Sequence, residues 1–160
     1  MNLARYFRPV VYVTLEPERL AMREVGSARR ISGPPLAAIS REPKRRIVAV
    51  GEAAKAAPDA DLFNPFKHPR TLLSDFTLAE QLVKAFLKQL FADRLFAASP
   101  IVVLHPRVDP EGGFTQIEIR ALQELGIGAG ASKVIVWQGR DLADEELLSL
   151  EFGSGGQVLQ

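Results

Sequence analysis

The residue types that most often carry out chemistry are sparse in this chain of 160 residues. Asp109 and Glu111 stand close together, but they lie in a Pro- and Gly-rich loop with no base or metal ligand beside them. The two histidines, His68 and His105, have no acidic partner at the spacing of a metal site. Cysteine is absent, which excludes disulfides, thiolate catalysis and cysteine-bound zinc. We therefore predict no catalytic group and no metal site, and we interpret these residues as a solvated loop and as structural histidines.

Charge is distributed unevenly along the chain. Residues 1–50 carry ten Lys or Arg against four Asp or Glu, whereas residues 111–160 carry three against eight. This pattern fits either chance clustering on solvated faces or a dipolar molecule that associates head to tail, or rests its basic end on an acidic surface. The candidate partner-binding residues of the basic part are Arg29, Arg30, Lys44, Arg45 and Arg46.

The basic run at residues 41–46 could also neutralise nucleic-acid phosphates. No aromatic residue interleaves with it for base stacking, so nucleic acid is not the partner that we expect.

The first eight residues form a separate segment. Leu3, Tyr6 and Phe7 can face one way with Arg5 and Arg8 beside them, as in a short amphipathic helix on a lipid surface. A frayed terminus or a packing arm is the open alternative. No signal-peptide core and no run of membrane-spanning length is present, so the sequence predicts a cytoplasmic protein, with peripheral contact at the inner face of the membrane as an option.

Length and composition predict one domain at residues 9–151, followed by a flexible tail at 152–160 that contains the glycine-rich GSGG. A β-α-β unit stands out in it. A strand is predicted at residues 100–105, a helix from the N-cap Thr115 with Glu118 completing a capping box, and a buried strand at 134–137. The predicted apolar face of this helix consists of Ile117, Ala121, Leu122 and Leu125, and Gly126, Gly128 and Gly130 are expected to end it.

The other predicted elements surround this unit. A hairpin of strands at 10–15 and 19–25 encloses the turn Glu16-Pro17-Glu18. A loop at 29–35 leads to strands at 36–40 and 47–50, joined by the basic turn. A short helix at 52–57, an irregular stretch at 59–74, an amphipathic helix at 77–91 and a closing helix at 141–150 complete the chain.

Several segments resemble segments of the bacterial actin family MreB, and they follow one another in the same order as in that family. They are TQIEIRAL followed by GAGASKVIVW, GPPLAAI, IVAVGEAAKAA and NPFKHPRTLLSDF with the helix after it, together spanning roughly residues 9–145. The resemblance and the element order imply an α/β, RNase H-like mixed sheet with flanking helices, like the first domain of actin-type ATPases.

The same resemblance implies that the ATPase chemistry is lost. The family's first phosphate loop has the form DxGT, and Val13, Leu15 and Glu16 stand in place of Asp, Gly and Thr. Glu16 and Glu18 would repel phosphate. Gln138 stands near the polar residue that positions the attacking water in the family, but the residues after it depart from the family pattern, so we regard Gln138 as at most vestigial. The second half of the family's nucleotide cleft is not in this sequence.

These observations favour a non-enzymatic, MreB-like interaction or scaffold module without a cofactor. Its expected partners are membrane, a full-length bacterial actin or copies of itself, in cell shape or envelope organisation. A nucleotide-binding ATPase subunit completed by oligomerisation or a second chain is the alternative, and a nucleic-acid-binding module is a third hypothesis.

Overall fold

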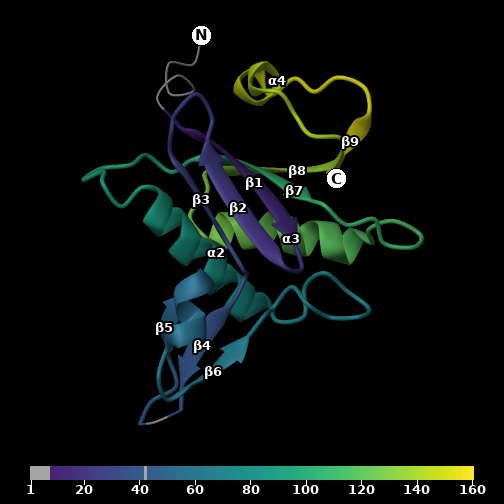
Figure 1. Ribbon diagram of the computed structural model, residues 1–160. Coiled ribbons are helices and arrows are strands. Elements are labelled where there is room, and N and C mark those ends of the chain that lie inside the picture. The colour runs from purple at the N-terminus through teal and green to yellow at the C-terminus, as the bar shows by residue number, and fades with distance from the viewer. Residues whose placement is uncertain (1–7, 42) are drawn as a thin grey trace.

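A six-stranded sheet in the order β3-β2-β1-β7-β8-β9 forms the centre of the molecule (Figure 1). The computed structural model describes residues 8–41 and 43–160, so the candidate residues Leu3, Arg5, Tyr6 and Phe7 lie outside its description. Strands β1, β7 and β8 are parallel, and the other neighbours pair antiparallel. The strands are β1 Val10–Glu16, β2 Arg19–Glu24, β3 Arg30–Gly33, β7 Ile101–Pro106, β8 Lys133–Gly139 and β9 Gly156–Leu159.

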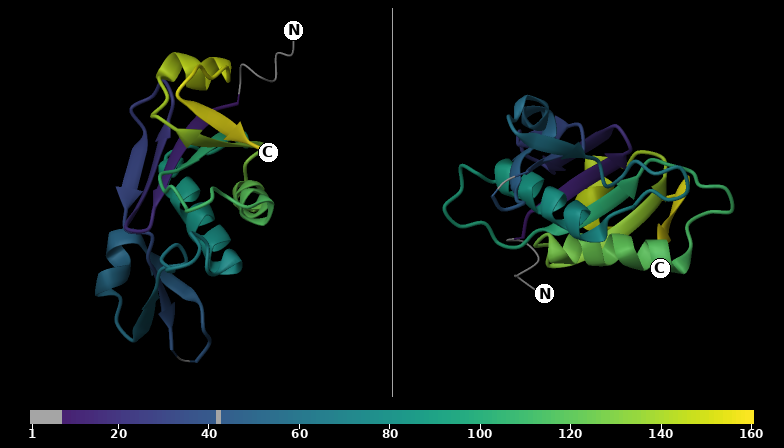
Figure 2. Two further views of the ribbon diagram at one scale, coloured as in Figure 1. Left: turned by 90° about the vertical axis from the view of Figure 1, so that its right-hand side faces the viewer. Right: turned by 90° about the horizontal axis from the view of Figure 1, so that it is seen from below.

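Helices cover both faces of this sheet. Helices α2 (Phe76–Leu90) and α3 (Gln116–Gly128) lie together on one side, and the short helix α4 (Asp144–Ser149) lies on the other (Figure 2). Side chains alternate along β1, so Val11, Val13 and Leu15 join the core under α2 and α3. Val10 and Tyr12 join the smaller cluster under α4.

Capping residues set the starts of the two long helices. The Asp75 side chain accepts a hydrogen bond of 3.0 Å from the amide of Leu78 at the start of α2. Thr115 and Glu118 form the predicted capping box of α3, each side chain bonding the other residue's amide. These caps fix where each helix begins and thus which residues face the sheet.

A second, three-stranded sheet extends from the first at one end (Figure 1). Its order is β5-β4-β6, all antiparallel, with β4 Ala37–Ser40, β5 Ile47–Val50 and β6 Ala60–Phe63. The 3₁₀ helix η1 (Gly51–Ala56) follows β5. The basic turn connects β4 to β5 at the tip of this sheet, as predicted.

The α/β mixed sheet that the sequence predicts is confirmed, with three local corrections. Residues 30–33, predicted as loop, form β3 because they pair with β2. Residues 60–63, inside the predicted irregular stretch, form β6 because they pair with β4. The closing helix, predicted at 141–150, is confined to Asp144–Ser149.

The prediction of a flexible tail at residues 152–160 is wrong. Residues 156–159 form β9, which pairs with β8 and buries Leu159 in the main core. An added Cβ on Gly139 would lie 2.4 Å from the Cα of Gly156, so only glycine allows this close approach of the two strands. Phe152 packs on Trp137 with ring centroids 5.3 Å apart, which anchors the start of the segment.

Helix α3 ends later than predicted, and the face that it turns to the core differs from the predicted face. Gly126 and Gly128 lie inside it instead of ending it. Ile117, predicted to face the core, is 82% exposed, whereas Ile119 is buried with Leu122 and Leu125. Gly126 faces β8, where an added Cβ would lie 2.5 Å from a Val134 methyl group.

We predict that Gly126→Ala destabilises the protein although alanine favours helix. The clash with Val134 is an overpacking of the kind that costs about 1–3 kcal/mol, against a propensity gain of roughly 1 kcal/mol. Chemical denaturation measures the difference. Val134→Ala in the same chain should recover most of the loss, and an undiminished loss in that double variant would contradict the packing argument. Gly128→Ala is the control, because its added Cβ meets only the flexible side chain of Glu80.

Candidate functional site

The carboxyl ends of the parallel strands β1, β7 and β8 meet at one edge of the sheet. Ligands of open α/β sheets bind outside this edge, where the loops leave the strands. Here the edge carries the β1–β2 turn, the loop at residues 107–115 and the segment after Gly139. It is therefore the place to look for nucleotide chemistry.

The β1–β2 turn consists of Pro17 and Glu18, between the paired residues Glu16 and Arg19. Val13 and Leu15 are fully buried in the core under α2 and α3, so they do not reach the edge. Proline has no amide hydrogen to offer, and Glu18 pairs with Lys67 at 2.6 Å. The turn thus presents carboxylates where a phosphate-binding loop would present glycine amides.

A hollow of about 350 Å³ opens between this turn, residues 66–72 and the loop at 108–114. Its lining contains the carboxylates of Asp109, Glu111 and Glu118 against one guanidinium, that of Arg70. Glu118 is also engaged in the capping box and with the Thr71 hydroxyl at 3.3 Å. An excess of negative charge makes this hollow unsuited to a polyphosphate.

Gln138 lies half-buried on β8 and reaches the same edge. Its Nε2 donates to Oδ1 of Asp109 at 3.4 Å, so the structure brings together two residues that the sequence treats separately. Gln138 is also the register partner of Gln157 on β9. The side of β8 next to Gln138 is therefore covered by the C-terminal strand β9.

His105 is buried and structural. Its Nε2 donates to the carbonyl oxygen of Gly139 at 3.0 Å, which leaves Nδ1 to accept the Tyr12 hydroxyl at 2.5 Å. Burial lowers the pKa of the His105 imidazole, and it raises the pKa of the Tyr12 hydroxyl. Both groups are thereby kept neutral inside the sheet. Among the described residues, no group of three or more His, Asp or Glu is arranged to hold a metal ion.

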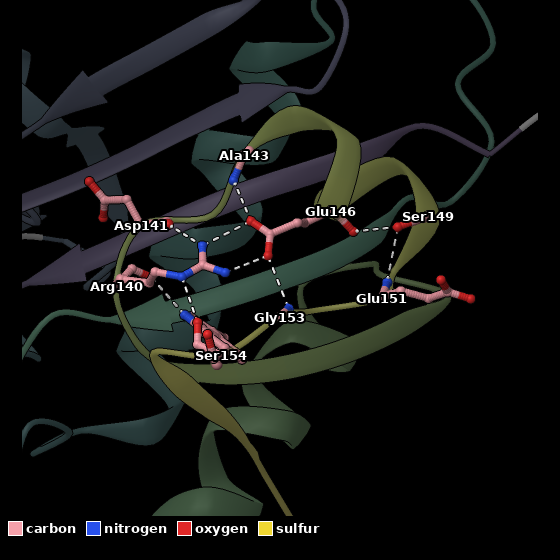
Figure 3. A network of polar contacts seen from close by, with 9 residues as sticks. Arg140, Asp141, Ala143, Glu146, Ser149, Glu151, Gly153 and Ser154 are labelled. Carbon is pink, nitrogen blue, oxygen red and sulfur yellow. Dashed lines mark hydrogen bonds and ion pairs between the residues drawn. The ribbon is translucent and has the colours of Figure 1, made fainter.

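Arg140 and Glu146 hold the C-terminal segment in place (Figure 3). They form a two-pronged ion pair with distances of 2.5 and 2.9 Å. Arg140 also donates to the carbonyl oxygen of Ser154, and Glu146 accepts from the amides of Ala143 and Gly153. The Arg140 guanidinium, aided by these amides, holds the pKa of the Glu146 carboxyl well below its usual range. Arg140, one of the residues that depart from the family pattern after Gln138, therefore helps to order the segment that leads into β9.

The basic candidate residues that the structure describes lie in four separate places. Arg29 lies between Asp93, at 2.8 Å, and the buried Glu24, at 3.3 Å, so its guanidinium is used within the fold. Arg30 lies on the open face of the large sheet. Lys44, Arg45 and Arg46 are exposed at the tip of the small sheet, and Arg8 is exposed before β1; Arg45 lies over the Phe63 ring at 5.8 Å. A role for the exposed ones in binding stays a prediction.

Sequence analysis missed one exposed apolar pair. Leu95 and Phe96 are 94% and 95% exposed in the loop between α2 and β7, whose residues 92–99 are all exposed. The signal that could have found them is an apolar pair placed after the end of the helical pattern, where no face remains to bury it. None of the helices in the described ranges has the length and apolar character needed to cross a bilayer.

Solved structures share this architecture. MreB5 of Spiroplasma citri bound to ADP matches with a TM-score of 0.61 and 22% identity, covering 81% of this chain and 37% of that chain. A non-polymerising mutant of MamK bound to AMPPNP matches with a TM-score of 0.65 and 14% identity, covering 81% and 40%. The mixed sheet with flanking helices is thus the fold of the first domain of actin-like proteins.

The family follows from sequence comparison. A family model described as MreB/Mbl protein matches residues 25–144. The cell shape-determining proteins MreB of Pasteurella multocida and Haemophilus influenzae are each 31% identical, over 133 and 135 residues respectively. The chain belongs to the MreB/Mbl family. The alignments cover 83% of this chain and 34% of each relative, so the chain spans about a third of the length of these curated relatives.

We predict that His105 makes stability depend on pH. Its pKa is lowered by folding, so the unfolded chain binds the proton more readily. Stability is fully present above the ordinary histidine pKa of about 6.5 and falls as the pH drops below it, by at most about 1.4 kcal/mol per pH unit. Denaturant unfolding between about pH 7.5 and pH 5.5 measures this slope.

His105→Gln removes the titrating group and should flatten the profile over this range. His68→Gln is the matched control, because it makes the same substitution at an exposed loop position. Identical slopes in the wild type and in His105→Gln would show that another group causes the pH dependence.

Proposed function

We propose that this chain is a non-enzymatic interaction module of the MreB family that acts through its surfaces in cell shape or envelope organisation. The observation that carries the proposal is the β1–β2 turn at the carboxyl edge of the sheet. Val13 and Leu15 are buried in the core below this edge, and Glu16 and Glu18 flank Pro17 in the turn, with Glu18 paired to Lys67. A triphosphate at this edge would face carboxylates instead of glycine amides.

The acidic hollow beside the turn supports the same proposal. Asp109 and Glu111 line it, and Asp109 also accepts from Gln138, the side chain that would otherwise be available to orient a water. Chemistry at this edge would need an attacking water and a bound phosphoryl group, and the local charge disfavours the second.

A lipid surface is the proposed site of action, with the chain cytoplasmic and peripheral. Leu95 and Phe96 are almost fully exposed at a loop, in the arrangement that lets apolar side chains enter the interfacial region of a membrane. Leu3, Tyr6 and Phe7, with Arg5 and Arg8, are further proposed contacts. Two or three apolar side chains bind weakly on their own, so assembly with further copies or with a full-length bacterial actin would strengthen the contact.

We predict that Leu95→Ser with Phe96→Ser weakens binding to phosphatidylglycerol vesicles. Burying each such side chain contributes roughly 1.5–3 kcal/mol, so the double variant should lose at least about tenfold in vesicle affinity. Cosedimentation with vesicles measures the bound fraction. Both side chains are exposed, so the free energy of unfolding should stay nearly constant.

The matched control is Ile117→Ser with Leu148→Ser, which removes two exposed apolar side chains from α3 and α4 instead. This variant should bind vesicles like the wild type. Equal loss in both double variants would mean that general hydrophobicity, and not the loop, drives the association.

The alternative function is a nucleotide-binding ATPase subunit completed by oligomerisation or by a second chain. What favours it is that MreB5 and MamK, which share the fold, were solved with ADP and AMPPNP bound. A second chain would have to supply the phosphate-binding groups that the β1–β2 turn lacks. ATP hydrolysis by an assembly would separate the two proposals.

A further inference from the structure

A groove of about 330 Å³ lies on the face of the large sheet opposite α2 and α3. Its floor consists of Thr14, Ala21 and Ser32, which are direct neighbours across strands β1, β2 and β3. These three side chains are small, so they leave a hollow between the longer side chains around them. The groove is separate from the carboxyl-edge hollow, whose lining shares no residue with it.

Four arginines surround this floor. Arg23 and Arg30 are register partners on β2 and β3, and Arg19 lies at the other end of β2. Arg107 enters from the loop after β7. Like charges directly opposite one another on antiparallel strands are destabilising, so Arg23 and Arg30 face each other at a cost that a bound anion would offset.

The positive charge of the groove is only partly neutralised within the molecule. Arg23 pairs with Asp144 at 2.8 Å and lies over the Tyr12 ring, and Arg107 pairs with Asp141 at 2.7 Å. Arg19 and Arg30 have no ion pair or hydrogen bond with any side chain in the described part of the chain. Arg19 lies opposite Glu16 in the register, but no ion pair joins them there. None of the described residues that line the groove is acidic.

We propose that this groove binds an oligophosphate, an anion that carries two or more linked or neighbouring phosphoryl groups. One guanidinium group can donate two parallel hydrogen bonds to a phosphate. The hydroxyls of Thr14 and Ser32 are further donors on the floor. Arg19 and Arg23 are four residues apart on one strand, about 13 Å, so they approach the floor from its two ends. This span fits an extended anion better than a single phosphate. The site goes beyond the proposed function, since it lies on another face and requires no hydrolysis.

Calorimetric titration with inorganic tripolyphosphate, and with orthophosphate for comparison, tests the site. We expect tripolyphosphate to bind and orthophosphate to bind at least about tenfold more weakly, because it reaches fewer guanidinium groups. Arg19→Gln with Arg30→Gln should weaken tripolyphosphate binding by at least about tenfold. The fold should persist, because both side chains lack partners among the described residues and their removal relieves repulsion.

Lys84→Gln with Lys88→Gln is the matched control, because it removes the same net charge from the exposed side of α2, on the other side of the sheet from the groove. This variant should bind tripolyphosphate within about twofold of the wild type. Absence of binding by the wild type, or equal weakening in both double variants, would overturn the proposal, since the second result indicates only long-range attraction.

Vesicles of phosphatidylcholine with cardiolipin identify the source of the phosphates. In chains that also carry Leu95→Ser with Phe96→Ser, so that the loop does not contribute, cosedimentation that is lost on Arg19→Gln with Arg30→Gln but kept in the control would assign the groove to lipid headgroups. Binding of tripolyphosphate without such cosedimentation would assign it to a soluble oligophosphate. Either result supports the site.

Discussion

The structure depends on the burial of strand β1 on both of its faces. One face of β1 contributes to the core under α2 and α3, and the other contributes to the cluster under α4. Its parallel pairing with β7, and that of β7 with β8, brings the ends of three strands to one edge. An antiparallel strand at each side, β2 and β9, then extends the sheet.

The burial of β1 is needed for the fold, and it leaves the buried side chains of this strand unable to contact a nucleotide. Val13 and Leu15 maintain the core that every strand needs, and the same two positions are where the resemblance expects phosphate-loop residues. A buried side chain cannot also contact a ligand at the strand edge. The β1–β2 turn at this edge carries the carboxylates of Glu16 and Glu18. The binding surfaces that we propose lie elsewhere, at the Leu95–Phe96 loop and at the arginines of the groove.

Local signals predicted much of the fold. The β1–β2 hairpin, the Thr115 capping box and the amphipathic α2 follow from periodicity and cap chemistry, which act within a few residues. Strands β6 and β9 were missed because each pairs with a strand from which another element separates it along the chain. Strand β3 pairs with the strand directly before it, but its four residues show too little apolar pattern to predict a strand. The Arg140–Glu146 ion pair that orders β9 joins residues which the sequence presents only as a departure from a family pattern.

The candidate surfaces also differ in whether local sequence or the folded arrangement brings their residues together. The basic run at the β4–β5 turn is visible in sequence because its residues are adjacent. The arginine groove is not, because Arg19, Arg30 and Arg107 come together only through strand register and a crossover connection.

We propose that this chain does not hydrolyse ATP, and phosphate release from Mg-ATP tests this proposal most directly. The assay should run over a wide range of protein concentrations, with vesicles and without them, because assembly could complete a site. The account predicts release equal to that of buffer at every concentration. Release that rises more steeply than protein concentration, and that is lost on Gln138→Ala, would contradict it and would identify an ATPase built from more than one chain.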